Sequence, residues 1–369
     1  MRILLVQTSF LGDTILSTPL IAALKKLHPQ AELWMMTTPL AATLVKRDPL
    51  LAGVITFAKR DTESGLGGLW KQARKLRALN FDLVYSLHRS ARTSLLLYLS
   101  RIPRRIGFRN ARLGFLYHEL RTRPQKLHDV ERNLALLDSE RHPDLPDSLR
   151  LFAPEIGELP PEIRAELPAP RSYVMMVPGS AWETKRWSTE GYRRVAEYLC
   201  GKGIDVVLTG SPEEAAICEE VAAGLKVLNL AGRSDLESAI YLARNARLLI
   251  CNDSMALHLA SAFKTPTVTV FCATVPAFGF GPWQNPKARI VEHPDLACRP
   301  CARHGGRKCP NRTWACSREL KADTVIGAVA ELLEIDGDKG IGPQADIDRP
   351  RETPANLSPL PRTTSDCKP

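Results

Sequence analysis

The chain has 369 residues, of which 44% are hydrophobic and 24% are charged, a composition typical of a folded globular protein. No apolar run approaches the roughly 18 residues that a membrane-spanning helix needs, and the N-terminus lacks the pattern of a signal peptide. We therefore expect a cytoplasmic protein, and its length indicates two domains because a single ordinary core does not grow to this size.

The net charge of +10 lies mainly in the first half of the chain. Residues 1–170 hold 25 Lys and Arg against 17 Asp and Glu, whereas residues 171–369 hold 25 against 23. The positive charge is densest in the segment RIPRRIGFRNAR, which contains Arg101, Arg104, Arg105, Arg109 and Arg112. Such a surface suits nucleic acid, an anionic membrane or an acidic substrate, and a solvated basic face without a partner is the alternative.

Strand and helix patterns alternate along the first 140 residues. Strands are predicted for residues 1–8 and for ELWMMT, VITF and FDLVYSLH, and helices for residues 14–28, 65–79 and 90–100. This alternation predicts a parallel sheet with helices on both faces. The glycine-rich ESGLGGLW follows no clear strand, so we interpret it as the entry to a helix and not as a phosphate-binding loop.

A proline-rich segment from about residue 142 interrupts these patterns and predicts a linker. A second alternating series follows, with strands at YVMMV, IDVVLTG, KVLNL, ARLLIC and TPTVTVF and helices near residues 189–202, 212–224, 234–245 and 254–263. We therefore predict an α/β protein of two Rossmann-like, doubly wound domains, residues 1–165 and 166–335, facing each other across a cleft. Residues 336–369 are polar and proline-rich and are predicted to be a disordered tail.

Three motifs lie where a strand turns into a helix, the edge at which open α/β sheets bind ligands. In FLGDTILSTP, Asp13 is placed either as a helix cap or as a base in the cleft. In PGSAWETKRW, the small Ser180 permits close approach of a ligand, and Lys185 and Arg186 offer charge suited to phosphate, although an ordinary surface loop fits the same residues.

The third motif, CNDSMALHLASAF, opens a helix directly after a buried strand. Asn252, Asp253 and Ser254 precede the free amides of that helix, a place suited to a nucleotide diphosphate. His258 lies one turn further along the same helix face as Ser254. A histidine on an apolar helix is more often a core residue than a catalyst, so both interpretations stay open here.

Four cysteines lie close together at residues 298–316: Cys298, Cys301, Cys309 and Cys316. In a cytosolic protein such a group favours metal ligands over disulfides. Structural zinc is our first hypothesis, although the second pair lacks the tight spacing of a zinc ribbon. Reduced structural thiols are the second hypothesis and an iron–sulfur cluster is the third.

GDTILSTP, PGSAWETKRW and NDSMALHLA, in this order, resemble the lipopolysaccharide heptosyltransferases of glycosyltransferase family nine, and the second heptosyltransferase more than the first. The resemblance covers about residues 1–335. It implies a GT-B fold, with the acceptor bound by the N-terminal domain and the nucleotide sugar by the C-terminal one. The implied activity is inverting transfer of heptose from ADP-heptose to the inner core of lipopolysaccharide, without a catalytic metal.

The resemblance also implies roles for single residues. Asp13 matches the proposed base, Lys185 the contact to the donor phosphates, and Asp253, Ser254 and His258 the donor-binding element. The acceptor, a lipid A that carries Kdo acids, is anionic and membrane-bound, so we expect a peripheral enzyme at the cytoplasmic surface of the inner membrane. The candidate acceptor contacts are Arg101, Arg104, Arg105 and Arg109.

Other functions remain open from the sequence. They are a GT-B transferase of another nucleotide sugar to a cell-envelope glycan, a non-catalytic sugar-nucleotide binder, and a metal-binding protein. We expect no nucleic-acid partner, because no recognisable nucleic-acid motif is present and few aromatic residues accompany the arginines.

Overall fold

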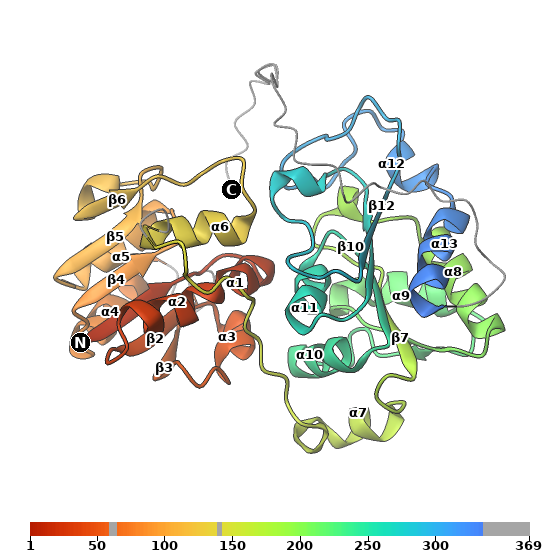
Figure 1. Cartoon of the computed structure of the whole chain (residues 1–369), viewed down its shortest axis with the longest axis horizontal. Coiled ribbons are helices and arrows are strands. Elements are labelled where there is room, and N and C mark those ends of the chain that lie inside the picture. Colours follow the sequence, from red (N-terminus) through yellow and green to blue (C-terminus); the bar gives the residue numbers. More distant parts are fainter. Residues whose placement is uncertain (59–64, 139–141, 335–369) are drawn as a thin grey trace.

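The computed structural model describes residues 1–58, 65–138 and 142–334, which form two parallel sheets covered by helices (Figure 1). Each sheet has six strands, in the orders β3-β2-β1-β4-β5-β6 and β12-β11-β10-β7-β8-β9. All strand pairs are parallel. This is the predicted α/β architecture of two doubly wound halves.

The N-terminal half begins with β1 and ends with α6. Its strands are β1 (Arg2–Val6), β2 (Glu32–Thr37), β3 (Gly53–Thr56), β4 (Leu83–Ser86), β5 (Arg104–Phe108) and β6 (Glu119–Arg121). Its helices are α1 (Leu11–Ser17), α2 (Pro19–Leu27), α3 (Pro39–Val45), α4 (Gly65–Ala78), α5 (Ala91–Leu99) and α6 (Asp129–Leu134). The helix predicted over residues 14–28 is two helices, because Pro19 lacks the amide that would continue the first and instead occupies the start of the second.

Side chains of β1 alternate between the two faces of the first sheet. Ile3 and Leu5 pack in the core cluster that contains α1 and α2, whereas Leu4 and Val6 pack in the cluster that contains α4 and α5. Buried strands of a parallel sheet are therefore apolar on both faces, as the run RILLV indicates.

The C-terminal half repeats this plan. Its strands are β7 (Tyr173–Val177), β8 (Asp205–Leu208), β9 (Leu228–Asn229), β10 (Leu248–Asn252), β11 (Thr267–Phe271) and β12 (Ala288–Glu292). Its helices are α8 (Thr189–Gly201), α9 (Ala215–Ala222), α10 (Leu236–Asn245), α11 (Met255–Phe263), α12 (Ala315–Arg318) and α13 (Ala322–Leu333).

The linker prediction implied that the proline-rich segment between the halves has no regular structure. The segment does contain a helix. It contains α7 (Pro161–Glu166), which starts on a proline, the one helical position where the missing amide costs nothing. The predicted boundary between residues 165 and 166 lies at the end of α7 and between the two sheets. The predicted tail, residues 336–369, lies outside the described residues.

The two halves meet through helices that follow strands. Helix α1 contacts α11, and α3 contacts α10. One hydrophobic cluster runs through this contact, with Ile15 and Leu16 from the first half and Leu257 and Ala260 from the second. Because α1 and α11 follow the carboxyl ends of the central strands β1 and β10, the two ligand-binding edges face each other. No helix of the described chain has the length and apolar character needed to span a membrane.

Candidate active site

Asp13 is the third residue of α1, at the edge of the first sheet that faces the second half. The N-cap residue is Phe10 and not Asp13, but the Phe10 amide donates to Oδ2 of Asp13 at 3.3 Å, so the carboxylate caps the helix from its third position. Burial raises the pKa of Asp13 to about 6, and the charge of Asp129 adds to this, while the Phe10 amide, Arg123 and Arg89 oppose it. A carboxyl group with a pKa near 6 is suited to accept a proton at neutral pH, so the cap and the base are not exclusive.

His258 of α11 lies directly across from α1. A Cβ atom placed on Gly12 would stand 3.0 Å from Cδ2 of His258, so the two halves touch beside Asp13. The side chain is buried, and its Nδ1 atom has no hydrogen-bond partner within the described chain. Burial lowers the pKa of His258 to about 4, so the imidazole is neutral at pH 7 and offers a hydrogen bond and not a charge.

Lys185 and Asp253 are brought together although they are far apart in the sequence. Nζ of Lys185 lies 2.7 Å from Oδ2 of Asp253, and the hydroxyl of Thr274 donates to the same oxygen at 2.7 Å. Both charged side chains are largely buried, so each holds the other in place. The lysine is therefore paired with protein and is positioned beside the start of α11.

The loop that carries Lys185 is supported by the cysteine-rich segment. The amide of Thr184 donates to the carbonyl of Gly306 at 3.0 Å, and the amide of Gly306 donates to the Thr184 hydroxyl at 2.8 Å. A Cβ on Gly305 would lie 3.0 Å from Cγ of Lys185, and the φ of +77° at this glycine also disfavours any larger residue. The segment thus restricts where Lys185 can lie.

Of the other predicted donor contacts, Ser254 fits a ligand best. It precedes α11, and its hydroxyl is buried and has no hydrogen-bond partner among the described residues. Ser180 is buried, and its carbonyl accepts from Nε of Arg186 at 2.8 Å, so Arg186 is turned towards its own loop. A ligand at Ser254 would find one free hydroxyl beside the amides of the first turn of α11.

Asn252 differs from its predicted role as a donor contact. Its side chain is fully buried, with Oδ1 accepting from the amide of Trp187 at 2.9 Å and Nδ2 donating to the carbonyls of Pro178 and Gly179 at 2.7 and 3.2 Å. All its polar atoms are occupied by protein. Asn252 therefore fixes the two ends of the PGSAWETKRW loop and does not face a ligand.

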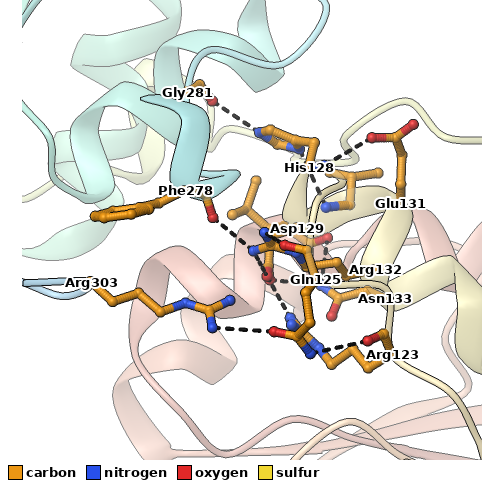
Figure 2. A network of polar contacts seen from close by, with 12 residues as sticks. Arg123, Gln125, His128, Asp129, Glu131, Arg132, Asn133, Phe278, Gly281 and Arg303 are labelled. Carbon is orange, nitrogen blue, oxygen red and sulfur yellow. Dashed lines mark hydrogen bonds and ion pairs between the residues drawn. The ribbon is translucent and has the colours of Figure 1, made fainter. Parts of the chain in front are cut away.

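Figure 2 shows a polar network around Asp129 that the sequence did not predict. Asp129 and Arg123 of this network act on the charge of Asp13 and so lie near it. Asp129 of α6 accepts from Arg123 at 2.5 Å, lies 3.5 Å from Nη1 of Arg132, and accepts from Nδ2 of Asn133 at 3.3 Å. Nη1 of Arg132 donates to the carbonyl of Phe278 at 2.8 Å, so the network crosses from the first half to the second. No motif signals it, because α6 has only six residues and the contacts to Phe278 and Arg303 come from a distant part of the chain.

Two further arginines surround this network. Arg303, from the cysteine-rich segment, donates to Oε1 of Gln125 at 3.3 Å and so joins the second half to the first. Burial and the neighbouring Arg123 lower the pKa of Arg89, and the carboxylates Asp129 and Asp13 raise it. Asp13 and Asp129 are therefore two acidic groups within a cluster of arginines, an arrangement suited to an anionic acceptor.

The predicted acceptor arginines divide between the two ends of β5. Arg101, Arg104 and Arg105 lie before or at its start, and Arg109 directly follows its carboxyl end. Because β5 runs parallel to β4 and β4 to β1, only Arg109 shares the sheet edge with Asp13. The first three lie at the other end of this strand, away from Asp13, and their contact with the acceptor stays a prediction.

The four clustered cysteines are unpaired thiols. In the part of the chain that the structure describes, no three or more His, Cys, Asp and Glu side chains are placed to hold a metal ion. The pKa of Cys316 is lowered to about 7, chiefly because the Cys272 thiol donates a hydrogen bond to it. Structural zinc stays a prediction from spacing, without support from the arrangement of these side chains.

Comparison with known proteins places this geometry in a family. The family model described as glycosyltransferase family 9 (heptosyltransferase) matches residues 69–312, about two thirds of the chain. The chain belongs to glycosyltransferase family 9. It is thus a member of a family of transferase enzymes, as the three motifs indicated.

Individual relatives in this family agree over most of the chain. A lipooligosaccharide heptosyltransferase 2 of Haemophilus ducreyi is 28% identical over 75% of this chain and 85% of its own length. A lipopolysaccharide heptosyltransferase 2 of Escherichia coli is 27% identical over 79% of this chain and 88% of its own. The solved structure of E. coli ADP-heptose LPS heptosyltransferase II superposes with a TM-score of 0.72 at 25% identity, covering 90% and 99% of the two chains. The predicted GT-B architecture is confirmed.

Proposed function

We propose that this chain transfers L-glycero-D-manno-heptose from ADP-heptose to the inner core of lipopolysaccharide, with inversion at the anomeric carbon. The observation that carries the proposal is the Asp13 carboxyl group, with a pKa of about 6, in the helix turn where Gly12 of the first half meets His258 of the second. Asp13 removes the proton from an acceptor hydroxyl as its oxygen attacks the anomeric carbon, and the bond to the ADP phosphate breaks on the opposite side.

The donor site in this proposal is built by the second half. The diphosphate lies at the start of α11, where the backbone amides and the Ser254 hydroxyl are free to donate. Lys185 supplies the positive charge, and the diphosphate competes with Asp253 for it. These fixed donors stabilise the charge that develops on the leaving group, so we propose that transfer needs no catalytic metal and expect it to persist in a chelator.

The acceptor site in this proposal is the basic cluster beside Asp13. Arg89, Arg123 and Arg303 surround the Asp13 and Asp129 carboxylates, and Arg109 lies at the same sheet edge. The Kdo sugars of the acceptor carry carboxylates that such guanidinium groups bind well. Cations close to the base also favour its ionised form, which partly offsets its burial.

The test is transfer of heptose to Kdo-lipid A, with and without one prior heptose, by the wild type and by Asp13→Asn. We expect transfer only to the heptosylated acceptor, and a loss of at least about 100-fold in Asp13→Asn with ADP-heptose binding retained. The matched control is Asp205→Asn, the same change at an exposed position at the start of β8. Undiminished transfer by Asp13→Asn would contradict the base, and no transfer to either acceptor would contradict the substrate assignment.

A further inference from the structure

The side of the N-terminal half formed by α4, α5 and the following turn carries exposed apolar residues together with a high positive charge. Residues 65–78 and 91–116 contain ten lysines and arginines and no acidic residue. Their ten basic residues equal the net charge of the whole chain, +10. We name the exposed part of these two segments the α4–α5 surface.

Large apolar side chains on this surface are unusually open to solvent. Leu66 and Phe115 are each 80% exposed, Tyr98 is 50% exposed and Trp70 is 43% exposed. Leu66 and Trp70 are four residues apart on α4 and so lie together, at the exposed edge of the stripe of Leu69, Ala73 and Leu76 that packs on the sheet. Exposed aromatic residues in such number normally mark a contact surface.

Arginines and aromatic rings alternate across this surface. The guanidinium groups of Arg74 and Arg77 lie 5.9 and 6.0 Å from the centre of the Trp70 ring, and that of Arg105 lies 5.7 Å from the Tyr98 ring. Between the two rings is a groove of about 410 Å³ lined by Trp70, Arg77, Tyr98, Leu99, Arg101, Ile102, Pro103 and Arg105. Arg101 and Arg105 therefore line this groove, whereas Arg104 forms an ion pair with Glu119.

We propose that the α4–α5 surface binds the anionic headgroups of a phospholipid bilayer, with the exposed aromatic and apolar side chains entering the interface. Tryptophan and tyrosine favour the boundary between headgroups and acyl chains, and basic residues bind anionic lipids. A protein partner would need acidic groups that match these basic residues and a complementary shape. An anionic bilayer needs neither, because its headgroups can bind basic residues anywhere on a broad surface. The proposal deepens the proposed function, because the acceptor of that reaction is a membrane lipid.

The position of the surface fits this role. Nη2 of Arg92, at the start of α5, donates to the carbonyl of Gly65, at the start of α4, at 3.0 Å. α5 begins just after the carboxyl end of β4, the sheet edge that holds Asp13. One end of the surface therefore borders the cleft, so a lipid held in the bilayer can present its sugars to the base from the side.

The test is sedimentation of the full chain with vesicles. This measurement needs no catalysis, so a negative result would count against the membrane surface and not against the proposed reaction. We expect binding to vesicles of phosphatidylethanolamine and phosphatidylglycerol and little binding to phosphatidylcholine. Lys71→Gln/Arg74→Gln should weaken binding roughly 10–30-fold, since each basic residue near an anionic surface contributes about 1 kcal/mol. Trp70→Ser/Phe115→Ser should weaken binding to a similar extent.

Matched controls lie on the second half of the molecule. Arg194→Gln/Lys226→Gln removes two exposed charges, and Ile290→Ser removes an exposed apolar side chain, so both should bind vesicles like the wild type. Equal binding by the wild type and the Trp70 and Lys71 variants would overturn the proposal, as would a wild type that does not sediment with anionic vesicles. A wild-type dimer that Trp70→Ser/Phe115→Ser converts to a monomer would also overturn it, by assigning the surface to a second copy.

Discussion

Asp13 caps helix α1 and is the proposed base. The pH dependence that follows from its pKa allows these two roles to be measured separately. The folded protein holds this carboxyl group at a pKa of about 6, against 3.8 for an unperturbed aspartate, so the folded state binds a proton more tightly than the unfolded one. The stability that this proton contributes is complete below about pH 4 and is lost as the pH rises through about 6. An ionised Asp13 therefore destabilises the fold at neutral pH.

Asp13→Asn removes this titration and keeps an oxygen that can accept from the Phe10 amide. As the pH rises from 4 to 7.5, we expect the free energy of unfolding of the variant to increase by about 1–3 kcal/mol relative to that of the wild type. Transfer of heptose should be lost. Urea unfolding at both pH values measures the difference. A variant that is destabilised equally at pH 4 and pH 7.5 would show that the carboxylate acts mainly as a cap.

The same pKa predicts the pH dependence of the reaction. The transfer rate of the wild type, measured as kcat/KM, should rise about tenfold per pH unit below pH 6 and level off above it, because only the ionised Asp13 accepts a proton. His258, whose pKa is about 4, should add no second step above pH 5. A rate that stays constant between pH 5 and pH 7, with chemistry limiting, would rule out a base of this kind.

The sequence predicted part of this site at the residue scale. Asp13, Lys185, Asp253, Ser254 and His258 follow strands at recognisable motifs, and the fold brings them to one cleft. The Asp129 network could not be predicted, because its contacts join α6 to a loop about 150 residues later. The motif of Asn252 predicts where this residue lies, but it could not predict that buried backbone groups contact its amide.

At the scale of elements, the loop after β11 determines how α6 is held. The short turn η6 (Pro276–Phe278) ends in Gly279, whose φ is +90° and whose carbonyl accepts from the amide of Asp129 at 2.8 Å. A Cβ at Gly279 would stand 2.6 Å from the carbonyl oxygen of Leu127 and 2.8 Å from Nη1 of Arg132. The backbone of this loop can therefore approach α6 only because the residue is glycine.

Gly279→Ala should consequently lower the free energy of unfolding by about 2 kcal/mol or more, through backbone strain and the displaced contact to α6. Gly201→Ala is the matched control, since Gly201 ends α8 with open space around it and alanine is the better helix former. Denaturant titration of both variants measures the effect. Equal stabilities would mean that the loop is free to move away from α6.

Helices and strands with a strong apolar pattern were predicted from the sequence. Those that depend on packing against distant residues were missed. The strands β1, β2, β10 and β11 were predicted from their apolar runs. β5 was missed because its first two residues are arginines, which indicated a basic surface, although its last three residues are buried. α7 was missed because prolines around it resemble a linker, and only its packing through Ile163 keeps it helical.

At the scale of the whole molecule, the two halves share a core and are not independent units joined by a linker. The cluster through α1 and α11 is continuous, and ion pairs extend the contact at its side. Arg47 of the first half lies 3.3 Å from Glu237 of α10 and 2.9 Å from Glu158 in the connecting segment. Separating the halves would expose apolar surface on both sides, at about 25 cal/mol per Å².

We therefore expect β1 and β10 to lose protection together when the protein unfolds. Native-state hydrogen exchange should give one free energy of opening for the amides of both strands, and that value should rise equally for both when ADP is added, since ligand binding stabilises the whole cooperative unit. The reason is that β1 cannot separate from α1 without breaking the cluster that also holds α11 against β10. Exchange in β1 at a clearly lower free energy than in β10, or protection by ADP confined to β10, would show instead that the halves open separately and that the cleft forms only when ligand is bound.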